Sequence, residues 1–180
     1  MRTHHTQRGI TLIEACIAVA IAAIAVGTAA PQFRQFIDKQ RLEGAAAQLA
    51  TDIRFARAES VMRNANLRLS VQSHGWGSCY IIHSGAASGC ECQSDGTASC
   101  SGDAVSIKNT AFTATDRLAL DSNVASIVFD PMHGTSTPAG TFKVALRGGP
   151  AIQHVVNLMG RVRTCSPNTD APAVPGYAVC

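Results

Sequence analysis

The stretch Gly9-Ile-Thr-Leu-Ile-Glu-Ala-Cys-Ile-Ala-Val-Ala-Ile-Ala-Ala-Ile-Ala-Val-Gly-Thr-Ala-Ala-Pro-Gln-Phe33 decides the fold of this chain of 180 residues. Residues 15–33 carry no charge, and a run of this length is at the threshold for crossing a bilayer core of ~30 Å. The polar segment before it contains Arg2 and Arg8, which the positive-inside rule keeps in the cytoplasm. The rest of the chain is therefore expected on the other side of the membrane. The alternative is an ordinary secretory signal that is cleaved near Ala30.

Glu14 is an acidic side chain just inside this apolar run. An ionised carboxylate in that position costs at least ~2.5–3.5 kcal/mol, so we expect it to have a specific role. The short basic leader ending in Gly9, the sequence Ile10-Thr-Leu-Ile-Glu14 and the apolar helix together resemble the signature of type IV prepilins. The resemblance implies cleavage after Gly9 by prepilin peptidase and methylation of the new N-terminus at Ile10. It also implies that Glu14 neutralises the N-terminal amine of a neighbouring subunit during filament assembly.

The chain is expected to have four parts and the α+β fold of type IV pilins, a long N-terminal helix packed on an antiparallel β-sheet head. These parts are the leader (1–9), a transmembrane or filament-core helix (10–33), an amphipathic second half of the helix (34–66) and a β-rich head (67–180). In the second half, apolar residues recur every three or four positions, namely Leu42, Ala45, Ala46, Leu49, Ile53 and Ala56. Asp52 and Arg54 are expected off this stripe or at its margins. The helix is expected to end near Asn64-Ala-Asn66, where an asparagine can serve as a left-handed cap.

The head is predicted to consist of β-strands. Alternation of apolar and polar residues over 67–72 indicates a half-buried strand. Further strands are expected at Cys79–His83, Val105–Ile107, Ala125–Phe129, Thr141–Leu146, Gln153–Leu158 and Arg161–Thr164. The segment Ser84–Asp103 is rich in Gly, Ser and Cys and is too long for a simple hairpin turn, so it is expected to be a polar loop.

The cysteines of the head indicate disulfide bonds rather than a metal site. Six of them would be exported into an oxidising compartment, where they predict three bridges with 15 possible connectivities; they are Cys79, Cys90, Cys92, Cys100, Cys165 and Cys180. Cys90 and Cys92 are too close to pair with each other, and Cys165 with Cys180 is the pairing we expect at the C-terminus. A metal site formed by Cys90, Cys92, Cys100 and His83 is the alternative, but it lacks the paired C-x-x-C spacing of structural zinc sites.

Composition and charge exclude several functional classes. Hydrophobic residues make up 46% of the chain and charged residues 15%, which excludes a disordered chain. The formal net charge is only +3, far below that of a strongly basic nucleic-acid binder. The histidines of the head are scattered and form no recognisable catalytic arrangement with Ser, Cys or Asp. We therefore expect no enzyme activity, no cofactor and no metal.

Several segments of the head, in this order, resemble the FimT/GspH family of minor pilins and pseudopilins. They are the helical segment Arg54–Asn64, the pair Gly75-Trp76, Val128-Phe-Asp-Pro131 with Gly134, Gly140-Thr-Phe142, and Gly160-Arg-Val-Arg163. The last of these is similar to a Gly-Arg-x-Arg motif through which FimT-type minor pilins bind DNA. The resemblance therefore implies that Gly160, Arg161 and Arg163 contact DNA.

The distribution of charge agrees with a basic patch near the C-terminus. Residues 67–141 contain three basic and six acidic side chains, whereas residues 142–180 contain four basic and one acidic. On an extended strand, Arg161 and Arg163 share one face about 6.6 Å apart, and paired guanidinium groups can hold successive phosphates. Lys143 and Arg147 are further candidates by charge alone. The alternative is an edge strand whose charges only discourage aggregation.

The sequence thus predicts a single-pass inner-membrane protein with a periplasmic head that later joins a pilus or pseudopilus. Its expected partners are prepilin peptidase, other pilins or pseudopilins, the inner membrane, and DNA bound without sequence preference. The favoured function is that of a minor type IV pilin that assists pilus assembly and binds DNA for uptake in natural transformation. The alternative is a minor pseudopilin with a purely structural role in a type II secretion system.

Overall fold

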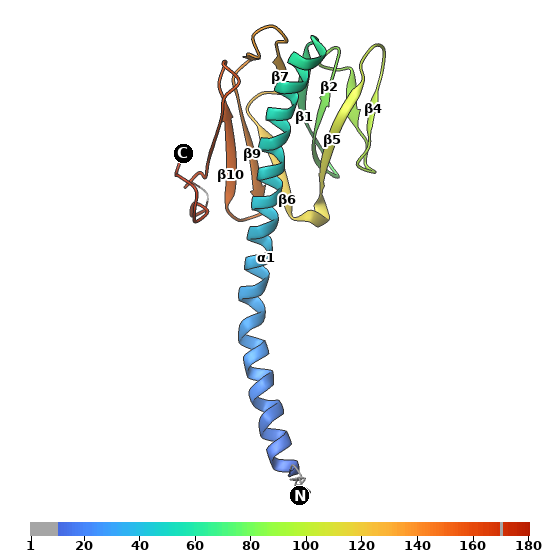
Figure 1. Ribbon diagram of the computed structural model, residues 1–180. Helices are drawn as coiled ribbons and strands as arrows, with labels where there is room; N and C mark the ends of the chain where they lie inside the picture. The colour runs from blue at the N-terminus through green and yellow to red at the C-terminus, as the bar shows by residue number, and fades with distance from the viewer. Residues whose placement is uncertain (1–10, 170) are drawn as a thin grey trace, which may run out of the picture. The chain divides into compact units, whose positions relative to one another are not determined.

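The computed structural model of the chain describes residues 11–169 and 171–180. These residues belong to two compact units, one ending at Gln40 and the other comprising Arg41–Cys180. The α-helix α1 (Leu12–Arg63) starts in the first unit and ends in the second (Figure 1). The second half of this helix therefore belongs to the same unit as the β-strands that follow it.

In residues 12–28 of the first unit, and again at Phe33 and Phe36, the apolar side chains of α1 are exposed to the surroundings. Those that are large and more than half exposed are Leu12, Ile13, Ile17, Val19, Ile21, Ile24, Val26, Phe33 and Phe36. The hydroxyl of Thr28 donates to the carbonyls of Ile24 and Ala25, so this polar group is satisfied within the helix. This helix is long and apolar enough to cross a bilayer. A helix that is apolar on all sides requires lipid or other protein chains to cover it.

The C-terminal end of α1 is fixed by a left-handed residue. Asn64 has a φ of 48°, and its N–H donates to the carbonyl of Val61 at 3.2 Å. The N–H of Ala65 donates to the carbonyl of Ser60 at 3.1 Å. These two bonds form a Schellman motif, which confirms the expected asparagine cap.

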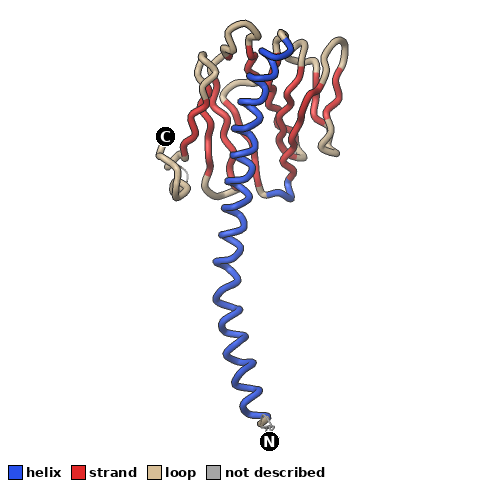
Figure 2. The backbone as a smooth tube through the Cα atoms, viewed as in Figure 1, coloured by secondary structure: helices blue, strands red, loops and turns tan. Residues whose placement is uncertain are grey.

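The strands of the second unit form three antiparallel sheets. The first has the order β5-β2-β1-β7-β8, the second β11-β10-β9-β6, and the third pairs β3 with β4. Figure 2 shows the second half of α1 lying across the two larger sheets. The bounds of the strands are β1 (Leu67–His74), β2 (Gly77–His83), β3 (Cys90–Cys92), β4 (Ala98–Cys100), β5 (Ser106–Thr113), β6 (Leu118–Ser122), β7 (Ser126–Phe129), β8 (Ser136–Thr137), β9 (Gly140–Leu146), β10 (Ala151–Val156) and β11 (Val162–Cys165). A 3-10 turn, η1 (Ala114–Asp116), links β5 to β6.

The main core lies between α1 and the two larger sheets. The predicted apolar stripe of the helix supplies five fully buried side chains, Leu42, Ala46, Leu49, Ile53 and Ala56. They pack with sheet residues such as Phe129 and Phe142, which are also fully buried. The fold is the expected one, a long helix packed on antiparallel sheets.

Asp52 corrects the expected polar face of α1. It was predicted at the margin of the stripe, but only 1% of its surface is exposed. Its carboxylate accepts hydrogen bonds from the Tyr80 hydroxyl at 2.7 Å and from Lys108 Nζ at 2.7 Å. Gln48 Nε2 adds two further bonds at 3.0 and 3.1 Å. The carboxylate can be buried because the first sheet and α1 itself supply its hydrogen-bond donors.

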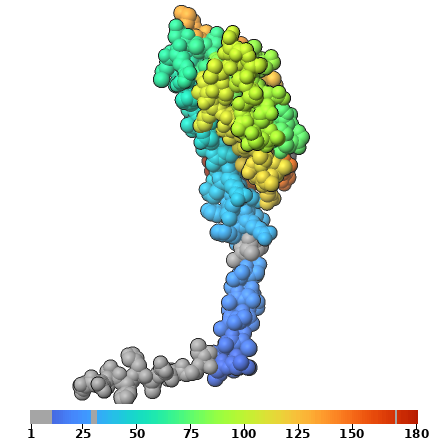
Figure 3. Space-filling model, turned by 90° about the vertical axis from the view of Figure 1, so that its right-hand side faces the viewer, coloured from blue at the N-terminus to red at the C-terminus, as the bar shows by residue number. Residues whose placement is uncertain are grey.

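Three disulfide bonds stabilise the head. Cys79–Cys92 ties β3 to β2, and Cys90–Cys100 joins β3 to β4, so Cys90 and Cys92 bond to different elements as expected. The segment predicted as a polar loop therefore contains a small hairpin that covers one side of the first sheet. Figure 3 looks onto this side of the head, whose surface is green to yellow. The expected bridge Cys165–Cys180 ties the C-terminal tail to β11.

Several of the other predicted strands begin or end at residues that differ from those predicted. The strand expected at Val105–Ile107 extends to Thr113 because it pairs along the whole of β2 despite its polar sequence. The strand expected at Gln153–Leu158 ends at Val156, because the chain turns after that residue. The last strand begins at Val162 rather than Arg161. β6 was missed, although it pairs with β9 over all of its five residues.

Candidate functional site

The expected assembly residue Glu14 lies in the first turn of α1. Its backbone N–H donates to the hydroxyl of Thr11 at 3.4 Å, and the N–H of Ala15 donates to the Thr11 carbonyl at 3.1 Å. Thr11 therefore caps the helix, and the carboxylate of Glu14 lies where the helix dipole favours a negative charge. The spacing Thr11-x-x-Glu14, typical of a capping box, could have predicted this arrangement. Gly9 and Ile10 lie outside the described residues.

Arg161 and Arg163 lie at the start of the edge strand β11. Both side chains are exposed, whereas Val162 between them is half-buried and packs against the main core. Arg163 pairs with Val155 of β10, and Arg161 is the last residue of the turn between the two strands. Among the described residues, no hydrogen bond or ion pair engages either guanidinium group. Two cations are thus held close together and remain available to an external anion.

The turn that carries these arginines is held by an asparagine that the sequence analysis did not identify. Asn157 Oδ1 accepts a hydrogen bond from the backbone N–H of Arg161 at 2.9 Å, and the Asn157 carbonyl accepts one from Gly160 at 2.8 Å. Ser136, which is fully buried, donates its hydroxyl to the same carbonyl at 2.6 Å. The N–H of Ser136 donates to the carbonyl of Leu158 at 2.9 Å. The turn is therefore anchored to β8, which limits the motion of the arginine backbone.

Gly160 is required by both its conformation and its surroundings. Its φ is +71°, which L side chains rarely adopt. A Cβ atom there would lie 2.7 Å from the carbonyl oxygen of Gly134 and 2.8 Å from Arg57 Nε. Arg57 in turn donates from Nε to the Gly134 carbonyl at 2.7 Å, which holds α1 to the loop between β7 and β8. No local sequence pattern indicates this role of Arg57, because 77 residues separate the two partners.

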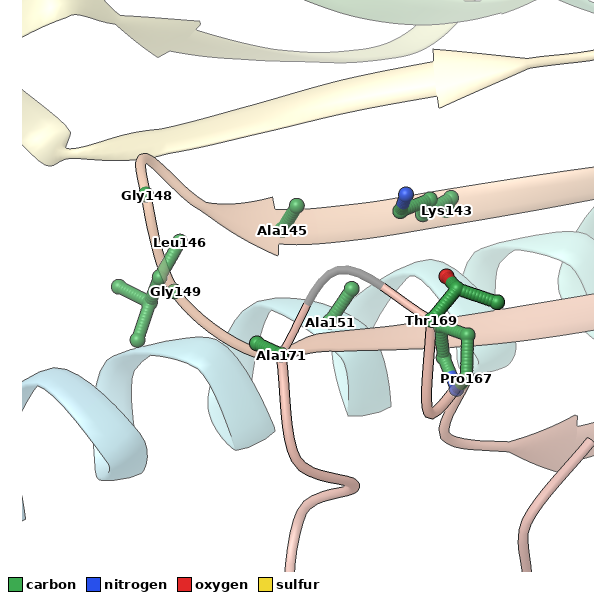
Figure 4. A pocket seen from close by; sticks show the side chains of 9 residues that line it. All are labelled: Lys143, Ala145, Leu146, Gly148, Gly149, Ala151, Pro167, Thr169 and Ala171. Carbon is green, nitrogen blue, oxygen red and sulfur yellow. The ribbon is translucent and has the colours of Figure 1, made fainter.

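The two other basic candidates do not join the arginine pair. Lys143 lies opposite Asp121 on β6 and has an interaction of its own. Strand spacing and rise place its Cα about 12 Å from that of Arg163. It lines a separate cavity of about 270 Å³ beside the C-terminal tail (Figure 4). Arg147 directly follows β9 at the opposite end of the sheet. Along the strand direction it is about 20 Å from Arg163.

The cysteines of the head and Asp130, for which we expected no catalytic role, take part in disulfide bonds and in a hydrogen-bonded turn. Cys90, Cys92 and Cys100 are all in disulfides, which overturns the alternative of a metal site with His83. The described residues contain no group of three His, Cys, Asp or Glu side chains that could hold a metal ion. Asp130 accepts hydrogen bonds from the backbone N–H groups of His133 and Met132, and chiefly the bond from His133 holds the pKa of Asp130 below the usual range. Turn chemistry therefore accounts for Asp130.

Two buried histidines connect elements of the head. His154 lies between Ala46 of α1 and Thr164 of β11, with Nε2 2.8 Å from the Ala46 carbonyl and Nδ1 2.9 Å from the Thr164 hydroxyl. His83 makes similar contacts with the Ser70 hydroxyl and the Ser84 carbonyl. Burial lowers the pKa of both imidazoles, so the neutral form is favoured in the folded state.

The chain matches solved structures of one minor pilin, in two crystal forms, and of one pseudopilin. The type IV minor pilin FimU of Pseudomonas aeruginosa matches with a TM-score of 0.56 and 19% identity, covering 74% of this chain and 98% of FimU. A second crystal form of FimU matches with a TM-score of 0.51 and 20% identity, covering 71% of this chain and 98% of FimU. The minor pseudopilin EpsH from the type 2 secretion system of Vibrio cholerae matches with a TM-score of 0.48 and 10% identity, covering 72% of this chain and 99% of EpsH. No curated protein sequence matches the chain.

The family is identified from a sequence match that covers the second half of α1 and most of the head. Residues 45–160 match the family described as type II transport protein GspH, which is more than half of the chain. The chain therefore belongs to the GspH family, and it is a minor pilin or pseudopilin, a structural and non-enzymatic protein with a long N-terminal helix packed on antiparallel β-sheets.

Proposed function

We propose that this chain is a minor type IV pilin that assists pilus assembly and binds DNA for uptake in natural transformation. The observation that carries the DNA role is the pair Arg161 and Arg163 at the anchored start of β11, two exposed guanidinium groups that make no hydrogen bond or ion pair within the described part of the chain. The Gly-Arg-x-Arg sequence at this turn supports the same role. The GspH match ends at Gly160, so the DNA role rests on the turn itself.

The chemistry of the turn favours contacts with phosphates. A guanidinium group can donate two parallel hydrogen bonds to a phosphate, and each strand of duplex DNA presents one phosphate charge per about 3.4 Å of helix axis. No aromatic side chain lies among residues 157–163, which comprise the turn and the arginine pair, so reading of bases is not expected. Two phosphate contacts give weak binding without sequence preference and contribute about 1.8 to the slope of log K against log salt concentration. Several subunits in one filament would raise the avidity.

The assembly role is proposed for the N-terminal segment. The exposed apolar part of α1 would lie first in the inner membrane and later against other pilins in the filament core. Cleavage after Gly9 by prepilin peptidase and methylation of Ile10 would create the amine that Glu14 of a neighbouring subunit neutralises. Glu14 is exposed at the start of the helix, where a second chain can reach it.

A titration of double-stranded DNA with the full-length protein in an uncharged detergent tests the DNA role. Replacing both Arg161 and Arg163 with Gln should remove most binding and lower the salt slope by about 1.8. The matched control is the double variant of Arg41 and Arg147 to Gln, two exposed arginines away from the turn. The control should bind as the wild type does. Equal binding by the Arg161/Arg163 variant and the wild type would refute the DNA role.

The second candidate function is that of a minor pseudopilin in a type II secretion system. The observation that favours it is the match of residues 45–160 to the type II transport protein GspH. In that case the arginines would serve only to keep the exposed edge strand β11 soluble. Loss of secretion in a strain that lacks this chain, with transformation unchanged, would favour this second function.

A further inference from the structure

A groove in the head opens beside the arginine turn. It has a volume of about 640 Å³ and lies between the end of α1, the loop that joins β7 to β8, and the turn that joins β10 to β11. Its lining includes Arg54, Arg57, Val61, Met132, His133 and Gly160. Gly160 directly precedes Arg161, so the groove is continuous with the turn that carries the arginine pair.

The two arginines of the groove have different roles. Arg57 is half-buried, and its Nε is occupied by the carbonyl of Gly134. Arg54 lies nearly one helical turn earlier and is exposed. Among the described residues, no hydrogen bond or ion pair engages the guanidinium group of Arg54. Arg54 is therefore the cation of the groove that an external anion can approach.

The acidic groups near the groove are already engaged. Asp130 accepts bonds from the backbone N–H groups of Met132 and His133 and lies 3.2 Å from the His133 ring. Glu59 accepts a hydrogen bond from Arg63 at 2.6 Å on the same helix. Arg63 offsets the charge of Glu59, and the two arginines that line the groove outweigh the one negative charge of Asp130, so the net charge beside the turn is positive.

We propose that the DNA backbone continues from the arginine pair into this groove, with Arg54 as a third phosphate-binding residue. The inference rests on the proposed DNA-binding function and extends it to α1. It follows from the continuity of groove and turn, from the exposed and unpaired Arg54, and from the charge complementarity with phosphate. The helix therefore contributes to ligand binding as well as to the core.

Three phosphate contacts make a quantitative difference to binding. Each contact contributes about 0.9 to the salt slope, so the wild type should show a slope about 2.7 rather than 1.8 in magnitude. Loss of one such contact lowers the association constant roughly eightfold at 0.1 M salt. Because Arg54 is exposed and makes no hydrogen bond within the described residues, its replacement should leave the thermal midpoint nearly unchanged.

The experiment titrates double-stranded DNA with the full-length protein in an uncharged detergent at four salt concentrations. Arg54→Gln should bind about eightfold more weakly at 0.1 M salt and with a slope lower by about 0.9, whereas Arg54→Lys should keep the slope. The matched control Arg41→Gln removes the same charge from the same helix, 13 positions earlier in the sequence. It should behave as the wild type does.

The outcomes separate this inference from the proposed function. Wild-type affinity and slope in Arg54→Gln, with binding lost in the Arg161/Arg163 variant, would overturn the role of Arg54 and leave the DNA role intact. Equal weakening by Arg54→Gln and Arg41→Gln would also overturn it, since the effect would then be one of net charge. Absence of DNA binding by the wild type would refute the proposed function and this inference together.

Discussion

The two halves of α1 belong to one continuous helix but differ in the burial of their apolar side chains. In residues 12–28, every large apolar side chain is more than half exposed. In residues 41–56, the side chains of Leu42, Leu49 and Ile53 are completely buried. The first half can bury its surface only against a membrane or other chains, whereas the second half is part of the core of the head. The same type of element thus contributes to assembly in one half and to stability in the other.

The largest effect is expected from Glu14 in the first half. Glu14→Ala should leave the protein inserted in the membrane but almost absent from filaments, because the proposed partner of the N-terminal amine is lost. Immunoblots of membranes and of sheared filaments measure the two pools. Glu43→Ala, which removes an acidic side chain from the second half of the helix, is the matched control. Normal incorporation of Glu14→Ala into filaments would contradict the proposed role.

A core substitution in the second half should cost the head much of its stability. Leu49→Ala should lower the free energy of unfolding by about 4 kcal/mol, since Leu49 is fully buried among α1 and both sheets. Ile21→Ala in the first half should change it by less than about 0.5 kcal/mol. Denaturant unfolding of the full-length protein in detergent, followed by the fluorescence of Trp76, measures both values. Similar losses in the two variants would break the distinction between the halves.

The C-terminal tail also contributes to the core of the second unit and therefore to its stability. Val174 is buried in the main core, and the tail that carries it is tied to β11 by Cys165–Cys180. Replacing both cysteines with Ser should lower the free energy of unfolding by about 3 kcal/mol, the cost expected for a closed loop of this length. The same unfolding experiment measures the loss. An unchanged midpoint would show that the tail adds nothing to the stability of the head.

A change of pH is expected to have a smaller effect, and only on the stability of the second unit. Burial lowers the pKa of His154, which contacts the Ala46 carbonyl of α1, and of His83 in the first sheet. The folded state therefore disfavours protonation, and its stability should be complete above an unfolded pKa of ~6.5 and decrease as the pH falls below that value.

Thermal unfolding between pH 7.5 and 5, a range above the titration of most carboxylates, measures this dependence. The midpoint should fall with pH in the wild type. A midpoint that does not change over this range would contradict the proposed effect of the buried imidazoles.

Regular patterns along the sequence predicted most of the fold. The apolar run, the stripe from Leu42 to Ala56 and the asparagine cap fixed both ends of α1 within a few residues. The alternation at 67–72 likewise identified β1. Pairing along the full length of a neighbouring strand was not predictable in this way, because β5 contains polar residues such as Lys108 and Asn109 that only the pairing with β2 keeps in a strand.

The candidate site was predictable only where its residues are adjacent in sequence. Arg161 and Arg163 were identified from the resemblance of Gly160–Arg163 to a Gly-Arg-x-Arg motif, and because residues two positions apart share one face of a strand. Arg54 and Arg57 reach the same turn from α1 through the tertiary fold, so no local pattern indicates them. Lys143 and Arg147 were grouped with the pair by net charge, which carries no information about distance across a sheet.

Protection of individual arginines from a dicarbonyl reagent by DNA tests the central claim most directly. The full-length protein in an uncharged detergent would be modified with phenylglyoxal with and without double-stranded DNA, and each arginine quantified by peptide mass spectrometry. The account predicts that DNA slows the modification of Arg161 and Arg163, and of Arg54 in the groove, while Arg41 and Arg147 react at the same rate. Equal modification of Arg161 and Arg163 with and without DNA would contradict the claim that this turn binds DNA.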